Sequence, residues 1–92
     1  MTVSNEILQR WGSTLERHAH YSPPTQAAVH AFQKAFVTWK SLYKSDVTAA
    51  VQWATRSQEA WNRLVRCRRE ETGHTMYLTP AEYEEARREH AG

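Results

Sequence analysis

Five histidines are the residues of this chain best suited to bind a metal or transfer a proton. A metal site on a helix needs ligands three or four positions apart, so that both side chains lie on one face. His18 and His20 are two positions apart, and Glu71 and His74 have the right spacing but span Gly73, a residue typical of helix ends. We therefore expect no metal site. We interpret His18 as a hydrogen-bonded histidine at the edge of an apolar core.

Cys67 is the one thiol in the chain and the candidate nucleophile. Neighbouring arginines would favour its thiolate if it were exposed, but it lies at the margin of an apolar helical face, where cysteine acts as a small hydrophobe. Two pairs of adjacent carboxylates are predicted to be solvated, Glu70 with Glu71 and Glu84 with Glu85, whereas acid–base catalysis needs burial to separate two pKa values. The sequence thus predicts a protein that is not an enzyme and uses no cofactor.

Length, charge and cysteine content narrow the class of protein. The 92 residues carry 12 basic and 10 acidic side chains, so we expect a single small domain, residues 1–92, whose charge neither requires nor excludes a polyanionic partner. A single cysteine rules out an internal disulfide and favours a reducing cytoplasm. No apolar run approaches the ~20 residues that span a bilayer. We expect a cytoplasmic protein with no membrane partner and no small-molecule substrate.

Apolar residues recur at spacings of three and four, which predicts an all-α fold. The clearest pattern is an aromatic stripe on one helical face, formed by Val29, Phe32, Phe36, Trp39 and Tyr43. Each ring removes roughly 150–250 Å² from water when it is buried, so we expect the stripe to lie against another surface, in this chain or in another molecule. Helices are predicted at about 3–20, 23–44, 46–72 and 80–90. They would form a three-helix bundle or an extended helical hairpin, with a short C-terminal fourth helix.

The ends of the two long helices are marked by capping residues. Ser22 and Pro23 predict the start of the second helix, and Gly73 predicts the end of the third. No glycine or proline separates these two helices, and a continuous helix of about 48 residues would reach about 70 Å. An oligomer could cover such a length, but we favour a break at Ser45 and Asp46, since either residue can cap a helix.

The last helix starts with a capping box, in which Thr79 and Glu82 satisfy each other's backbone N–H groups. Its remaining surface is heavily charged, and its one partly apolar face consists of Tyr83, Ala86 and His90. We expect this helix to dock weakly. The residues that would anchor it are Met76, Tyr77 and Leu78.

The third helix has an apolar arc wider than half of its circumference, as expected for a helix that contacts two neighbours. Its members are Val47, Ala50, Val51, Ala54, Trp61, Leu64 and Val65, flanked by Trp53, Ala60 and Cys67. Arginine beside tryptophan and tyrosine is typical of interface hot spots. Our first hypothesis is a non-enzymatic interaction module, such as an adaptor, accessory subunit or small inhibitor, that binds another protein or a second copy of itself. Its predicted partner-binding residues are Trp53, Arg56, Ala60 and Arg63.

Nucleic-acid binding is the alternative hypothesis. A basic strip on the second and third helices could contact phosphates, through Lys40, Lys44, Arg63, Arg66 and Arg69. Glu59 interrupts this strip, and most of the rings that could stack on bases lie on predicted core faces.

Overall fold

A computed structural model describes residues 17–91, which form three helices and no strand. The helices are α2 (Pro23–Leu42), α3 (Val47–Thr72) and α4 (Pro80–Ala91). The predicted all-α class is confirmed. The helix predicted at 3–20 lies outside the described residues except for its last four positions, where Arg17 is helical and the next three residues form a turn.

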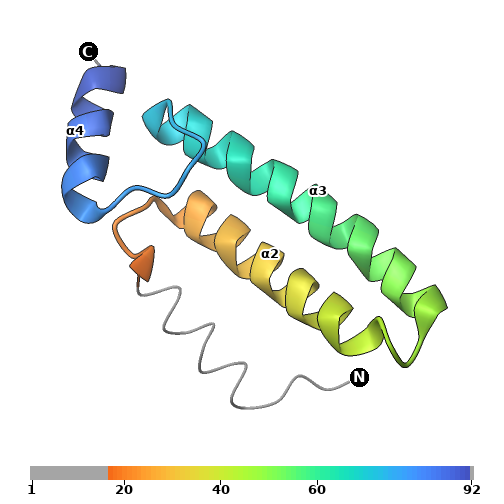
Figure 1. The fold of residues 1–92 in the computed structure, drawn as a ribbon. Coiled ribbons are helices and arrows are strands. Elements are labelled where there is room, and N and C mark those ends of the chain that lie inside the picture. Colours follow the sequence, from red (N-terminus) through yellow and green to blue (C-terminus); the bar gives the residue numbers. More distant parts are fainter. Residues whose placement is uncertain (1–16, 92) are drawn as a thin grey trace.

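α2 and α3 lie side by side as an antiparallel hairpin, and α4 lies across the end where α2 begins and α3 ends (Figure 1). The two long helices are separate, because α2 ends at Leu42 and α3 begins at Val47. Asp46 caps α3 by accepting a hydrogen bond from the backbone N–H of Ala49 at 3.1 Å. The predicted break at Ser45 and Asp46 is therefore confirmed.

Two further helix ends follow the sequence signals. Gly73 ends α3 in the left-handed conformation, at a φ of 78°. Thr79 donates hydrogen bonds to the Glu82 carboxylate through its backbone N–H and hydroxyl, at 3.1 and 2.8 Å, which completes the predicted capping box. Ser22 occupies the N-cap position of α2 as predicted, but its side chain makes no capping bond within α2. The backbone N–H of Ser22 instead donates a hydrogen bond to the carboxylate of Glu71, a residue of α3.

The contact between α2 and α3 is built mainly from small side chains. The buried residues of α2 are Thr25, Ala28, Val29, Ala35, Thr38 and Leu42. Those of α3 are Ala50, Ser57, Leu64, Arg68 and Thr72. Small residues at the contact let the two backbones approach closely. As a result the hairpin core is narrow, and larger rings that flank it stay near its margin.

The aromatic stripe lies along that margin. Val29 is buried, Phe32 and Trp39 are half-buried, and Phe36 and Tyr43 are 39 % and 47 % exposed. The described part of this chain therefore covers the stripe only in part, and contact of the remaining rings with another molecule stays a prediction. The reason is that the parallel row of small residues on α2, and not the row of rings, faces α3.

The predicted apolar arc of α3 is also only partly buried. Ala50 and Leu64 are in the core, whereas Val47, Val51 and Trp61 are 69 %, 62 % and 38 % exposed. The arc spans more of the helix than one neighbouring helix can cover.

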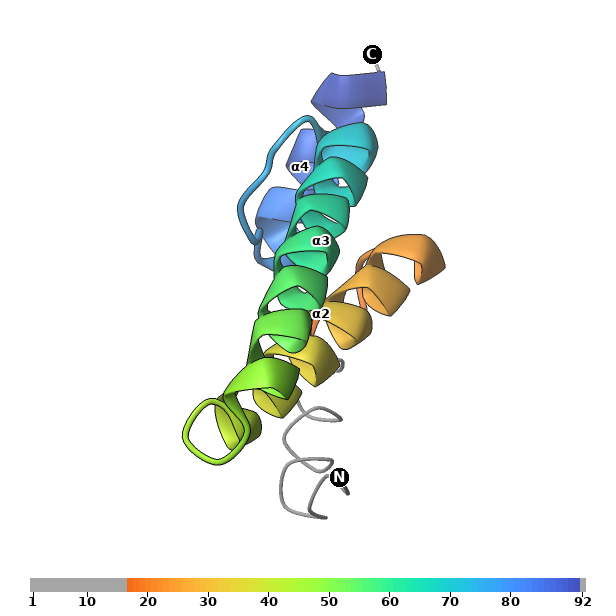
Figure 2. The same ribbon diagram turned by 90° about the vertical axis from the view of Figure 1, so that its right-hand side faces the viewer.

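α4 docks more firmly than predicted. Tyr83 and Ala86 are buried in one cluster with Tyr21 and Leu78. Figure 2 shows α4 beside the C-terminal end of α3. Leu78 therefore acts as an anchor, as predicted. Met76 does not, because it is 70 % exposed.

Candidate functional site

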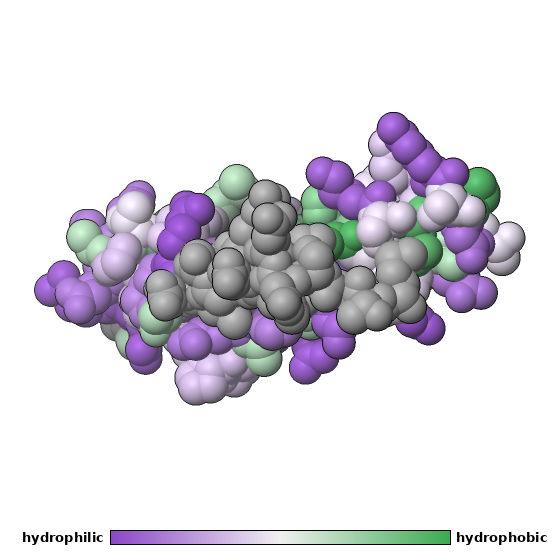
Figure 3. All heavy atoms as spheres, turned by 90° about the horizontal axis from the view of Figure 1, so that it is seen from below, coloured by the Kyte–Doolittle hydropathy of each residue, from purple (hydrophilic) through white to green (hydrophobic). Residues whose placement is uncertain are grey.

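The rings of α2 form a continuous ladder on the outside of the hairpin. Centroid separations are 5.8 Å from Phe32 to Phe36, 5.8 Å from Phe36 to Trp39 and 5.7 Å from Trp39 to Tyr43. Spacings of three and four residues produce this ladder, because such neighbours lie above one another on a helix. Strongly hydrophobic side chains also gather at the molecule's end near the α2–α3 turn (Figure 3).

An open groove of about 410 Å³ runs between this ladder and α3. Trp61 forms the opposite wall, with its ring 5.1 Å from that of Phe32. Ala54 and Ser57 lie between the walls, where their small side chains leave space. We call this surface the aromatic groove. It is lined by Phe32, Phe36, Trp39, Ala54, Ser57, Gln58 and Trp61.

The rim of the aromatic groove is basic on its α2 side. The Lys40 ammonium lies 5.7 Å from the centre of the Phe36 ring, and the Lys44 ammonium lies 5.5 Å from that of Tyr43. Both contacts are cation–π interactions. No acidic residue lines the groove within the described chain.

The predicted partner-binding residues lie on the other margin of α3. Trp53 and Ala60 follow the buried residues Ala50 and Ser57 by three positions, whereas the groove residues Ala54 and Trp61 follow them by four, so the two pairs flank the core on opposite sides. Trp53 is half-buried, with the guanidinium of its neighbour Arg56 4.6 Å from the ring centre.

The structure thus keeps the predicted partner-binding set on one side of α3. It does not bring Trp53, Arg56, Ala60 or Arg63 to the aromatic groove.

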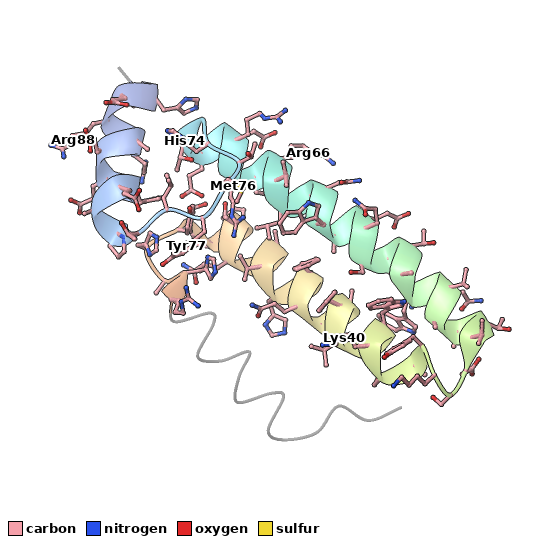
Figure 4. All side chains as sticks on the ribbon, viewed as in Figure 1. Lys40, Arg66, His74, Met76, Tyr77 and Arg88 are labelled. Carbon is pink, nitrogen blue, oxygen red and sulfur yellow. The ribbon has the colours of Figure 1, made fainter. Side chains whose placement is uncertain are left out.

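The predicted phosphate-binding residues do not form one strip. Lys40 and Arg66 extend from opposite edges of the hairpin (Figure 4). Lys44 lies near Tyr43 at the end of the ring ladder, whereas Arg63, Arg66 and Arg69 are spaced three residues apart and so spread around the exposed side of α3. Lys40 and Lys44 are the part of this set that shares a surface with the rings.

A second cluster, at the α4 end, centres on Glu71. Its carboxylate accepts hydrogen bonds from the Ser22 backbone N–H at 2.7 Å, the Ser22 hydroxyl at 3.0 Å and the Thr25 hydroxyl at 2.6 Å. The Tyr83 hydroxyl of α4 donates a fourth hydrogen bond. One carboxylate from α3 therefore caps the N-terminus of α2, where the helix dipole favours a negative charge, and also holds α4. We call this arrangement the Glu71 lock.

The hydrogen bonds of the Glu71 lock determine its protonation. Burial raises the pKa of the Glu71 carboxyl, but the donors Thr25, Tyr83 and Ser22 outweigh burial, so that this pKa lies below its usual value. Burial, followed by the hydrogen bond to Glu71, raises the pKa of the Tyr83 hydroxyl. The expectation that Glu71 is solvated is wrong, because folding brings the end of α3 beside the start of α2, a relation that local spacing does not reveal.

Rings with polar atoms surround the Glu71 lock. The Tyr21 hydroxyl accepts a hydrogen bond from the Leu78 backbone N–H at 2.9 Å, and the His20 ring nitrogen Nε2 lies 2.8 Å from the Leu78 carbonyl oxygen. The Tyr77 hydroxyl donates to the Arg17 carbonyl at 3.2 Å, close to the start of the described chain (Figure 4). These contacts tie the segment before α2 to the segment before α4.

His18 is buried as predicted, but the prediction of a hydrogen-bonded ring is not met at Nδ1, which has no partner. Burial, with the nearby charge of Arg68, lowers the pKa of His18 to about 4, so the ring is neutral at pH 7. Arg68 is itself buried, and its Nη1 donates to the Thr75 carbonyl at 3.3 Å. Burial lowers the pKa of this guanidinium.

The described residues contain no cluster of three side chains able to hold a metal ion. Cys67 is a half-buried free thiol packed against the core formed by Ala28, Val29 and Leu64, which fits the packing role predicted for it. In the same part of the chain, no helix has the length and apolar character needed to cross a bilayer. Searches against protein-family models, curated proteins and solved structures find no match to this chain.

Proposed function

We propose that this protein is a non-enzymatic interaction module whose aromatic groove binds the apolar face of an amphipathic helix in a partner protein. The observation that carries this proposal is the ring ladder at the margin of the hairpin core, in which Phe36 and Tyr43 stay exposed while Phe32 and Trp39 are half-buried. A contiguous exposed apolar surface is characteristic of binding sites. Aromatic side chains are also the usual anchors of interface hot spots.

A helix is the occupant that suits the shape of the groove. Its walls run along two neighbouring helices, so an occupant follows their axes and packs its side chains between the rings of α2 and Trp61. The small residues Ala54 and Ser57 leave room for a large apolar side chain from the partner. The module would act as an adaptor, accessory subunit or small inhibitor, and its single cysteine suits a reducing cytoplasm.

Binding of single-stranded nucleic acid is the second candidate, supported by two lysines beside a row of rings. It is less well supported than a protein partner. Two neighbouring pairs in the ladder are stacked, with interplanar angles of 27° and 25°, and the Phe36–Trp39 pair is tilted at 38°, so the rings already contact one another. Base stacking requires free ring faces.

The proposal is tested by selecting binders from a displayed library of amphipathic helices, using the full chain as bait. Selected peptides are then measured by fluorescence anisotropy against wild type, Phe36→Ala and Trp61→Ala. We expect each substitution to weaken binding at least tenfold, or about 1.4 kcal/mol. Both variants should retain the helical circular dichroism spectrum, because neither ring is in the hairpin core.

The matched control is the double variant Trp53→Ala, Arg56→Ala, which alters the opposite margin of α3. Peptide affinity should change less than about twofold, since these residues are remote from the groove. Selected peptides that depend on Trp53 and Arg56, but not on Phe36 and Trp61, would move the interface to that margin. A selection that yields no binder sensitive to the groove substitutions rejects the proposal.

A further inference from the structure

We propose that the aromatic groove selects an acidic partner: an amphipathic helix with carboxylates beside its apolar strip. This inference rests on the proposed function and specifies the chemistry of the occupant. Its basis is the placement of Lys40 and Lys44 along the ring ladder.

No carboxylate lines the groove in the described chain, and α2 contains no acidic residue. Asp46, two residues after Lys44, accepts the backbone hydrogen bond that caps α3. The α3 positions that follow the groove margin are Val47, Val51, Ala54, Gln58, Trp61 and Val65, all uncharged. An occupant of the groove therefore meets positive charge on the α2 side and neutral side chains on the α3 side. A helix with negative charge along one flank complements that pattern.

The two lysines lie at the end of α2 and just beyond it. Lys40 is in the last turn of α2, which ends at Leu42, and Lys44 is in the turn that follows. Each ammonium lies near a ring of the ladder, Lys40 near Phe36 and Lys44 near Tyr43. A partner helix that runs along the groove presents side chains at positions i and i+4 about 6 Å apart along its axis. Each lysine stem lies near a ring and its ammonium remains at the rim, as lysine does when it covers apolar surface. Two ion pairs can therefore form while the apolar strip of the partner contacts the rings.

The rest of this chain does not supply such an occupant. Residues 1–16 contain two carboxylates, Glu6 and Glu16, which are ten positions apart. Carboxylates three or four positions apart occur within α4, as in Glu85 and Glu89, but the apolar residues of α4 are already buried against its own chain. A separate protein with an acidic amphipathic helix is the occupant that the charges favour over residues 1–16 or a second copy.

The inference is tested with two synthetic helical peptides that share one apolar face. One carries Glu at two flanking positions four apart, and the other carries Lys there. In anisotropy titrations of the full chain at low salt, we expect the Glu peptide to bind at least about tenfold more tightly. The difference should shrink as salt is raised, because the charges lie at the rim. The double variant Lys40→Glu, Lys44→Glu should reverse the preference.

The matched control is Lys34→Glu, Arg63→Glu, which changes the net charge equally at exposed positions away from the groove. It should leave the peptide preference unchanged. If both peptides bind equally well and Phe36→Ala abolishes binding of both, the acidic preference is overturned and the proposed function stays intact. Failure of both peptides to bind, or binding insensitive to Phe36→Ala, would count against both proposals.

Two further measurements identify a different occupant. If an oligothymidylate competes with the Glu peptide and depends on Phe36, the occupant is nucleic acid and the inference is overturned. If light scattering shows a dimer that Phe36→Ala dissociates, the groove binds a second copy. A full-chain variant with Trp11→Ala that binds the Glu peptide more tightly would assign the groove to residues 1–16. The acidic partner is supported if the protein is monomeric, oligothymidylate does not compete, and Trp11→Ala does not tighten binding of the Glu peptide.

Discussion

The two ends of the hairpin use aromatic residues in opposite ways. At the α4 end, Tyr21 and Tyr83 are buried, and their hydroxyls are hydrogen-bonded to a backbone N–H and to Glu71. Toward the α2–α3 turn, the apolar ring of Phe36 and the ring of Tyr43 remain exposed. Hydrophobicity alone would predict the reverse, with phenylalanine inside and tyrosine outside.

This difference separates a structural region from the region that we propose binds a partner. Rings with polar atoms can be buried at the α4 end because each hydroxyl finds a partner there, as a buried polar group requires. Along the groove, small residues form the hairpin core between the two helices, and the rings remain at its margin. We infer that the Glu71 lock maintains the fold and that the aromatic groove is free to bind.

The largest effect that would test this comparison is expected from Glu71→Ala. Four donors lose a charged acceptor, and the buried Thr25 hydroxyl is left without it. We expect the free energy of unfolding in urea to fall by about 3 kcal/mol. The neighbouring exposed residue is the control, and Glu70→Ala should change stability by less than about 0.5 kcal/mol. Similar small effects at both positions would show that the lock does not stabilise the fold.

A pH titration should give the next largest effect, through His18. Its pKa is about 4 in the folded protein, against 6.5 for an unperturbed histidine. The unfolded chain therefore binds the proton first as pH falls, and stability present above pH 6.5 is lost progressively toward pH 4. We expect a loss of about 2 kcal/mol by pH 5.

The pH effect is measured by urea unfolding at several values between about 7.5 and 5. Glu71 is not expected to cause the loss, because its hydrogen bonds hold its pKa below the usual value of a glutamate. His18→Phe removes the titrating ring and should flatten the dependence. An equally steep loss of stability in that variant would show that another group is responsible.

A smaller effect is expected from removing single hydroxyls at the two ends. Tyr83→Phe deletes the hydrogen bond to Glu71 but keeps the ring, and should lower the free energy of unfolding by about 1.5 kcal/mol. Tyr43→Phe, on the exposed ladder, should change it by less than about 0.5 kcal/mol. Thermal and urea unfolding of both variants measure the difference. Equal effects would remove the contrast between a structural end and a binding end.

Much of the secondary structure could be predicted from the sequence. The break at Asp46, the left-handed end at Gly73 and the capping box at Thr79 depend on residues close together in the chain, and the structure confirms all three. These features are local because a cap satisfies backbone groups within one helical turn.

The candidate sites depended on tertiary structure. The spacing of the rings placed them on one face of α2. Burial of that face depended on which row of α2 side chains packs against α3. The row of small residues packs there, because it allows the two helices to approach closely. Glu71 gained its role through partners 46 and 49 positions away, beyond the reach of any local pattern. The sequence by itself thus determined where the helices begin and end, whereas the packing of the helices decided which side chains became core, lock and open surface.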